Sequence, residues 1–185
     1  MLMVESPRGL YAVMFSVNFN ETVKVLFFKA ATAGTWHYDA VAQREALYRV
    51  NHQVNAYCYT ATAHYAPTPC KHVVTGGKRY LVFPQLGECC TCCTADKAGC
   101  GITPPDWLKD AVFQGTTEIQ GIPAYDWRIA SWFLPKHWYA SADAAQVPLE
   151  LDQMPNDRQT FWPGTFQEGP PPPDVFQLPE GCNDL

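Results

Sequence analysis

The chain has 185 residues, of which 47% are hydrophobic, 14% aromatic and 17% charged, with a net charge of −5 at pH 7. That length fits a single domain with a sizeable core, and so apolar a composition excludes an intrinsically disordered chain. The acidic balance leaves no basic surface for nucleic acid, and the sequence holds no run of the 18 or more apolar residues that a membrane-spanning helix needs.

Short runs rich in β-branched and aromatic residues follow one another along most of the chain and predict strands. The first two, residues 10–19 and 22–28, are separated by Asn20 and Glu21, which predicts a hairpin with Asn20 on its exposed turn. The other predicted strands are residues 34–38, 45–50, 56–65, 79–83, 111–114, 117–120, 125–130, 138–142 and 147–152. The sequence therefore predicts a mainly antiparallel β fold.

Helical signals are few, so we expect one or two short helices. Two prolines followed by Asp106 are typical of a helix start and predict a helix near residues 105–110, while residues 40–47 fit either a second helix or a strand. Four consecutive prolines near the C-terminus favour a stiff, extended backbone. The sequence predicts one β domain over residues 1–168 and a proline-rich strap, residues 169–185, tied back through Cys182.

Eight cysteines, an even number, indicate disulfides and hence an oxidising compartment. Five of them crowd into residues 89–100, where we expect vicinal cysteines to bond different partners and staple a strand-poor loop to the sheet. A zinc or redox site is less favoured, because the spacing lacks a second Cys-x-x-Cys pair and a βαβ context. All eight are predicted to be disulfide-bonded, in a pairing that stays open: Cys58, Cys70, Cys89, Cys90, Cys92, Cys93, Cys100 and Cys182.

The triplet Asn20-Glu21-Thr22 is an acceptor for Asn-linked glycan. Together with the cysteines, it predicts a secreted protein or one in the lumen of an oxidising compartment, with Asn20 as the glycosylation site.

No common catalytic motif occurs, and the histidines are not at metal-ligand spacing, so we predict neither catalytic residues nor a metal site. The pairs Asp106-Trp107 and Asp126-Trp127 would suit carbohydrate chemistry. However, Asp106 fits the first turn of a helix, and Trp127 fits a core-facing strand position.

The order of several short motifs resembles a family of secreted plant and algal proteins and, more distantly, the ependymin-related proteins. These motifs are Trp36-His37-Tyr38-Asp39, the run from Cys100 to Leu108, the run from Gly121 to Trp127, Trp138-Tyr139, residues 147–151 and the run from Leu178 to Cys182. The resemblance implies the bacterial lipoprotein-carrier (LolA-like) fold, in which a strongly curved antiparallel sheet, or half-barrel, wraps around short helices and encloses an apolar cavity. Ala124 stands where the relatives have a cysteine, so their disulfide pattern is not carried over.

A curved sheet with this many aromatic side chains can form an apolar pocket on its concave face. The leading hypothesis is a non-enzymatic carrier for a hydrophobic small molecule (a lipid, a fatty acid or a carotenoid-like ligand) that needs no cofactor. The alternatives are an extracellular structural or interaction subunit of a homo- or hetero-oligomer, and a carbohydrate-active or carbohydrate-binding protein. The predicted ligand contacts are Phe15, Phe27, Trp36, Tyr48, Tyr57, Tyr59, Phe83, Trp127 and Trp138.

Overall fold

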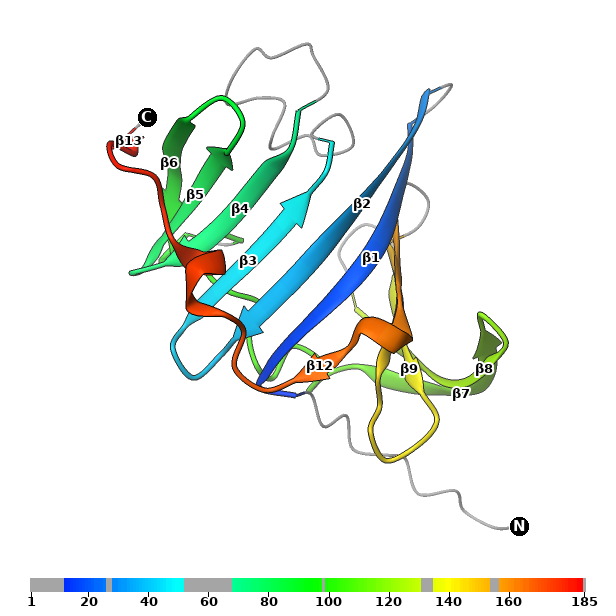
Figure 1. Ribbon diagram of the computed structural model, residues 1–185. Coiled ribbons are helices and arrows are strands. Elements are labelled where there is room, and N and C mark those ends of the chain that lie inside the picture. The colour runs from blue at the N-terminus through cyan, green and yellow to red at the C-terminus, as the bar shows by residue number, and fades with distance from the viewer. Residues whose placement is uncertain are drawn as a thin grey trace, which may run out of the picture.

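The computed structural model describes residues 12–25, 28–51, 68–97, 99–130, 135–153 and 157–184. Almost all of its regular structure is one 13-stranded sheet, in the order β13-β6-β5-β4-β3-β2-β1-β11-β10-β9-β8-β7, with β12 added beside β1. Figure 1 shows that β8 and β9 turn away from the plane of β3 to β6, so the sheet is strongly curved. The two ends of this order do not pair with each other. The prediction of a mainly antiparallel, curved and open sheet is confirmed.

The elements have the following bounds: β1 Met14–Val25, β2 Phe28–Asp39, β3 Arg44–Arg49, β4 Cys70–Thr75, β5 Lys78–Phe83, β6 Glu88–Thr94, β7 Val112–Ile119, β8 Ile122–Ile129, β9 Lys136–Ser141, β10 Pro148–Gln153, β11 Asp157–Phe161, η2 Pro163–Thr165, β12 Gln167–Glu168, η3 Pro173–Phe176 and β13 Asn183–Asp184.

The first two predicted strands are a single strand, β1, and the hairpin turn predicted at Asn20 is wrong. Asn20 lies in mid-strand, where it pairs with Ala33 on β2 and with Thr160 on β11. Glu21 looked like a turn residue, but its side chain is buried and ion-paired. The β1–β2 hairpin instead closes between Val25 and Phe28. Asn20 itself is still exposed, as one of the polar side chains that alternate with buried ones along β1.

The two faces of the sheet differ, and we call inner the face that carries the large aromatic cluster. Strand alternation places Phe15, Val17 and Phe19 on this face, and the curvature brings in aromatic side chains from β8, β9 and β11. The rings pack closely, as between Trp138 and Phe161, whose centroids are 5.5 Å apart. The buried members of the inner core are Phe15, Val17, Phe19, Trp36, Tyr38, Ala40, Trp127, Trp138, Ala140 and Phe161.

Two tight hairpins depend on residues with positive φ. Gly76 and Gly77 join β4 to β5, and Gln120 and Gly121 join β7 to β8. Left-handed conformations at both central positions match the twist of the paired strands. The separately predicted strands 111–114 and 117–120 merge into β7, across a bulge at Gly115.

The helix predicted near residues 105–110 is wrong, because this segment forms consecutive turns. Its backbone hydrogen bonds span three residues, as from Trp107 N to Pro104 O and from Lys109 N to Asp106 O. The Trp107 ring packs against Trp138 with a centroid distance of 5.1 Å. The helical elements in the described residues are the short 3-10 turns η2 and η3, and residues 40–47 form a turn that leads into β3.

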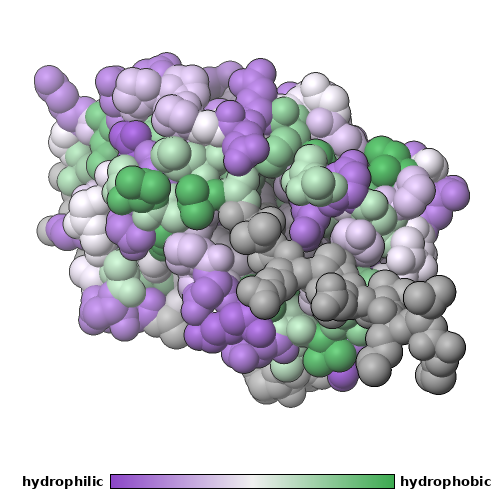
Figure 2. Space-filling view, turned by 90° about the horizontal axis from the view of Figure 1, so that it is seen from below, coloured by the Kyte–Doolittle hydropathy of each residue, from purple (hydrophilic) through white to green (hydrophobic). Residues whose placement is uncertain are grey.

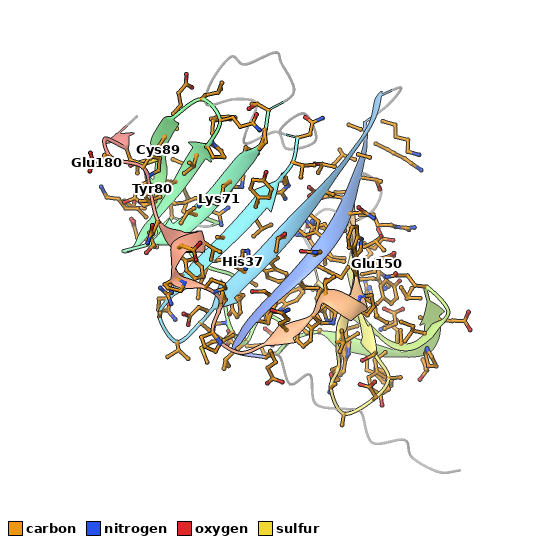
Figure 3. The ribbon with its side chains drawn as sticks, viewed as in Figure 1. His37, Lys71, Tyr80, Cys89, Glu150 and Glu180 are labelled. Atoms are coloured by element: carbon orange, nitrogen blue, oxygen red, sulfur yellow. A yellow bond between two sulfur atoms is a disulfide. The ribbon has the colours of Figure 1, made fainter. Side chains whose placement is uncertain are left out.

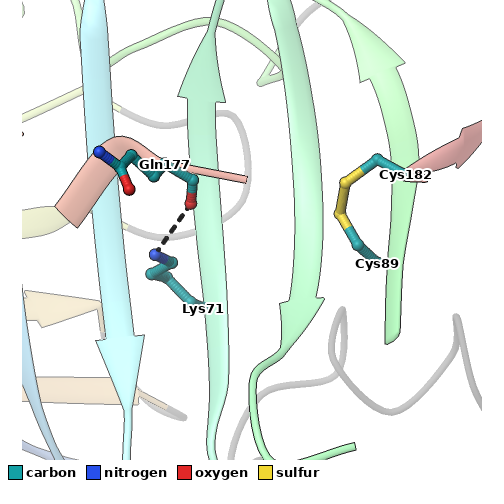
Figure 4. The surroundings of a disulfide bond; sticks show 4 residues. All are labelled: Lys71, Cys89, Gln177 and Cys182. Carbon is teal, nitrogen blue, oxygen red and sulfur yellow. Dashed lines mark hydrogen bonds between the residues drawn. A yellow bond between two sulfur atoms is a disulfide. The ribbon is translucent and has the colours of Figure 1, made fainter. Parts of the chain in front are cut away.

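The C-terminal segment crosses the outer face over β3 and β4 (Figures 1 and 3). Phe176 of η3 is buried there against Ala46, Val73 and Val82. Lys71 Nζ donates to the carbonyl oxygens of Val175 and Gln177, at 3.0 and 3.4 Å. Cys182 forms a disulfide with Cys89 on β6, which Figure 4 shows beside the Lys71–Gln177 hydrogen bond.

The cysteine-rich segment forms strand β6 and not the strand-poor loop that was predicted. Neighbouring residues of a strand point to opposite faces, so Cys89 reaches the strap on the outer face while Cys90 is buried beside Cys70, Leu81 and Phe83. A bulge in the β5–β6 pairing leaves Cys92 without a ladder partner. Cys93 bonds Cys100.

Two of the predicted disulfide cysteines are free thiols, which corrects the prediction that all eight are bonded. Cys90 is buried and Cys92 exposed, and their thiols hydrogen-bond each other along the same strand. Cys70 is disulfide-bonded, whereas Cys58 lies outside the described residues. Different partners for adjacent cysteines were expected, but nothing in the spacing singles out which thiols remain reduced.

Candidate functional site

A cavity of about 740 Å³ lies between the inner face of the sheet and the segment that joins β6 to β7. Such a volume falls within the range of small-molecule sites. The side chains around it come from both halves of the curved sheet, which therefore face each other across the cavity. Its lining residues are Trp36, Glu45, Leu47, Arg79, Ala95, Asp96, Lys97, Gly99, Gly101, Ile102, Thr103, Pro104, Trp107, Ile129, Lys136, Leu151, Gln153 and Gln159.

The connecting segment is anchored at several points, so one wall of the cavity is held in place. The Cys93–Cys100 disulfide ties its first part to β6. Arg79 Nη2 donates to the carbonyl oxygen of Gly101 at 3.1 Å, and the hydroxyl of Tyr38 donates to that of Thr103 at 2.8 Å. These contacts reach the segment from β2, β5 and β6.

Apolar side chains form most of the walls. Trp36 and Leu47 are directly paired on β2 and β3, and therefore stand side by side on the inner face. Ile129 on β8 and Leu151 on β10 face them from the other half of the sheet, and Trp107 closes one side. Asp96 and Lys97 are exposed and mark the mouth of the cavity.

A buried carboxyl group, that of Glu45, lies at the foot of the connecting segment. Trp36 Nε1 and the backbone N of Thr103 each donate to it at 2.7 Å, and the Thr103 hydroxyl donates at 3.1 Å. Burial raises the pKa of Glu45, while these hydrogen bonds and the charge of Arg79 oppose the shift. The carboxyl thus fixes the segment and has its hydrogen-bonding capacity largely used.

A second polar group of residues lies behind the cavity wall formed by Gln153 and Gln159. Gln153 Nε2 donates to Asp157 Oδ2 at 3.0 Å, and Gln159 Nε2 donates to Glu21 Oε1 at 2.8 Å. Glu21 is also ion-paired with Arg49. Burial, and then the charge of Glu21, raises the pKa of Asp157 to about 7. The cavity is therefore amphipathic, with apolar walls and polar groups at its margins.

The predicted ligand contacts are divided by the structure. Trp36 lines the cavity, whereas Phe15, Trp127 and Trp138 are packed into the inner core and Phe83 into a separate buried cluster. Tyr48 pairs with Thr35 and Lys71 and lies on the outer face, because strand alternation directs its neighbour Leu47 inward. None of these five residues lines this cavity. Phe27, Tyr57 and Tyr59 lie outside the described residues.

Several lining residues were missed by the sequence reasoning. Leu47, Ile129 and Leu151 occur in predicted strands but are aliphatic, whereas the predicted ligand contacts are all aromatic. Trp107 was noted only for its neighbour Asp106. Their common inner-face position follows from the pairing register, which a single sequence does not reveal.

The residues weighed for catalysis have other roles. Asp106 forms an exposed ion pair with Lys109 at 2.9 Å. Asp126 Oδ1 lies 2.7 Å from His137 Nδ1, on the outer face. Trp127 is buried, as expected.

The remaining histidines are distributed over both faces. His37, also on the outer face, has its Nδ1 2.8 Å from Ser16 Oγ, and burial lowers its pKa. His72 is buried on the inner face, where burial lowers its pKa to about 3. His52 and His64 lie outside the described residues.

Within the described part of the chain, no three His, Cys, Asp or Glu side chains are grouped so as to hold a metal ion. None of the helices found there is long and apolar enough to cross a membrane. On the face seen in Figure 2, hydrophobic side chains form small patches among hydrophilic ones.

Neither a protein-family model nor a curated protein matches the sequence. Among solved structures, the chain is similar to an uncharacterized conserved protein from Thermus thermophilus, with a TM-score of 0.58 and 8% identity, over 94% of this chain and 90% of that one. This similarity shows a shared fold.

Two further solved structures are less similar. LprF from Mycobacterium bovis has a TM-score of 0.45 and 14% identity, covering 91% of this chain and 90% of its own. A LolA superfamily protein from Nitrosomonas europaea has a TM-score of 0.42 and 8% identity, covering 90% of this chain and 91% of its own.

Proposed function

We propose that the protein is a non-enzymatic binding protein that carries a hydrophobic small molecule in the cavity between its inner face and the segment joining β6 to β7. The observation that supports this most directly is the cavity itself, which has about 740 Å³ and walls formed by Trp36, Leu47, Trp107, Ile129 and Leu151. Transfer of an apolar ligand from water to such walls is favourable in proportion to the area it buries.

The anchoring of the cavity wall supports a largely preformed site. A disulfide to β6 and hydrogen bonds from β2 and β5 hold the connecting segment in place before any ligand arrives. Less conformational entropy is then lost on binding, which favours affinity. The exposed mouth at Asp96 and Lys97 gives the ligand a way in.

The disulfides indicate an oxidising environment. We extend this to a proposed secreted or lumenal location, in which Asn20, exposed on the outer side of β1, carries the glycan. The proposed cargo is a lipid-like molecule, and this proposal requires no partner subunit.

The test is a titration with N-phenyl-1-naphthylamine, a neutral apolar probe whose fluorescence rises in an apolar site. The variant Ile129→Trp should fill the cavity and weaken probe binding at least tenfold. Val112→Trp is the matched control, because Val112 is 55% exposed on β7 and does not line the cavity. Bound ligand should also raise the melting temperature of the wild type, since it binds only the folded state. Equal probe binding by wild type and Ile129→Trp would exclude this cavity as the site.

A further inference from the structure

Arg79 is a cation that lines the cavity and carries a buried hydrogen-bond donor without an acceptor. It lies on β5, opposite Val74 on β4 and Cys93 on β6, and its side chain is half-buried. Its Nη2 donates to Gly101. Its Nε is buried and has no hydrogen-bond partner. A guanidinium group stays charged at any physiological pH, so this N–H group belongs to a permanent cation.

The acidic group that acts on Arg79 does not satisfy this donor. Glu45 feels the charge of Arg79, but its carboxyl oxygens are occupied by Trp36 and Thr103. No carboxylate of the described residues forms an ion pair with Arg79 within 4.0 Å. The other titratable groups near it, His72 and Cys92, are neutral at pH 7, because burial lowers the pKa of the histidine to about 3 and raises that of the thiol to about 11.

A buried donor on a charged group is costly to leave without an acceptor. A carboxylate forms a strong, charge-assisted hydrogen bond with a guanidinium group. The bond to Gly101 uses one of the five guanidinium N–H groups, so donors of Arg79 remain for a ligand.

The other cations of the cavity are placed differently. Lys97 is exposed at the mouth. The positive charge of Lys136 acts on Asp157 and opposes the rise in the pKa of that carboxyl group. Lys136 therefore belongs to the polar group behind Gln153 and Gln159. Of the three cations that line the cavity, Arg79 is therefore the one with a buried donor that has no acceptor.

We infer that the cargo is a long-chain carboxylic acid, whose carboxylate accepts from Arg79 Nε while its hydrocarbon chain lies along Trp36, Leu47 and the opposite wall of the cavity. This rests on the proposed function and adds to it the chemical class of the ligand and the residue that recognises its head group.

The experiment compares dodecanoic acid with dodecanol at pH 8, by displacement of N-phenyl-1-naphthylamine from wild type, Arg79→Gln, Arg79→Lys and Lys24→Gln. In the wild type the acid should bind at least tenfold more tightly than the alcohol. Arg79→Gln should lose about tenfold in affinity for the acid and leave the alcohol unchanged. Lys24→Gln, the control at an exposed lysine of β1 that does not line the cavity, should change neither. Arg79→Lys, which keeps the charge but not Nε, should fall between.

The outcomes separate the two proposals. If acid and alcohol bind the wild type equally, the inference fails and the apolar carrier stands. If neither displaces the probe, the proposed function fails. Tighter binding of dodecyl phosphate than of dodecanoic acid would overturn the carboxylate assignment. Circular dichroism checks the fold of each variant, and if Arg79→Gln does not fold because its bond to Gly101 is lost, the acid-to-alcohol ratio of Arg79→Lys decides.

Discussion

Arg49 on β3 reaches across β2 to form a buried ion pair with Glu21 on β1. The residue of β2 opposite Arg49 is Gly34, which is also paired with Phe19. A Cβ at Gly34 would lie 2.3 Å from the Tyr48 carbonyl oxygen and 2.5 Å from the Phe19 ring. The missing side chain leaves room for the Phe19 ring and, beside it, for the Arg49 guanidinium, 5.7 Å from the ring centroid.

Gly34→Ala should therefore destabilise the protein by about 2–4 kcal/mol, because the methyl group meets backbone as well as a fully buried ring. Urea unfolding gives the free-energy difference. Gly164→Ala is the control, since a Cβ there would meet nothing within 4 Å. A loss no greater than that of the control would show that the strands can shift to accept the methyl group.

The Glu21–Arg49 pair should be coupled in a double-mutant cycle. Glu21→Gln and Arg49→Met should each cost about 3–5 kcal/mol, because each leaves a buried charge without its counterion. The double variant should lose less than the sum, since it removes both charges. Additive losses in urea unfolding would mean that the two charges do not depend on each other.

Asp157 should make the protein less stable as the pH rises. Its pKa is about 7 in the folded protein, against a usual value of 3.8. Between these two pH values the folded state keeps a proton that the unfolded state has released, so stability falls from about pH 4 upward and levels off above pH 7. The difference is worth at most about 4 kcal/mol.

Asp157→Asn removes this titration while an amide oxygen can still accept from Gln153. The stability of the variant relative to the wild type should therefore increase between pH 5 and pH 8, measured as the urea midpoint of each protein at both pH values. If the difference in urea midpoint between variant and wild type is the same at both pH values, groups other than Asp157 cause the pH dependence.

The two free thiols should react at different stages of unfolding. Cys92 is exposed and should be labelled by iodoacetamide in the native protein, whereas buried Cys90 should need denaturant. Partial burial of its sulfur raises the pKa of Cys92 to about 11, so its labelling rate should rise about tenfold per pH unit between pH 7 and pH 9. Mass spectrometry of Cys92→Ser and Cys90→Ser identifies each site. Labelling of neither cysteine in unreduced, denatured protein would mean that both are oxidised.

Asn20 should carry glycan in protein from a eukaryotic secretory source. Its side chain is exposed although it lies in a strand. Treatment with a glycosidase that removes Asn-linked sugars should lower the mass, and Asn20→Gln should abolish the shift. An unchanged mass in natively sourced protein would count against a secreted location.

The sequence predicts much of the sheet, because β-branched and aromatic residues alternate in most of its strands. It does not reveal β11, because the inward-facing residues Asp157 and Gln159 are polar. Their position is explained by their hydrogen bonds to Gln153 and Glu21. It also obscures β6, since cysteines in a row do not indicate a strand.

The candidate site was harder to predict than the fold. Trp36 was identified as a contact, but the opposite wall depends on how far the sheet curves and on the register of its strands. The Arg79 donor is distinctive only because Gly101 takes Nη2 and burial isolates Nε. Neither fact has a signature in the order of the amino acids.

The Cys89–Cys182 bond has a topological consequence. It turns residues 89–182 into a closed covalent ring. In the sheet, strand β6 of this ring lies next to β5, and strand β11 of the ring lies next to β1. The strap of the ring crosses the outer face of the strands between them, and its segment from β6 to β7 passes on the inner face. Strands β1 to β5 are thereby encircled, and while the bond is intact the N-terminal part of the sheet can separate from the rest only by sliding out of this belt.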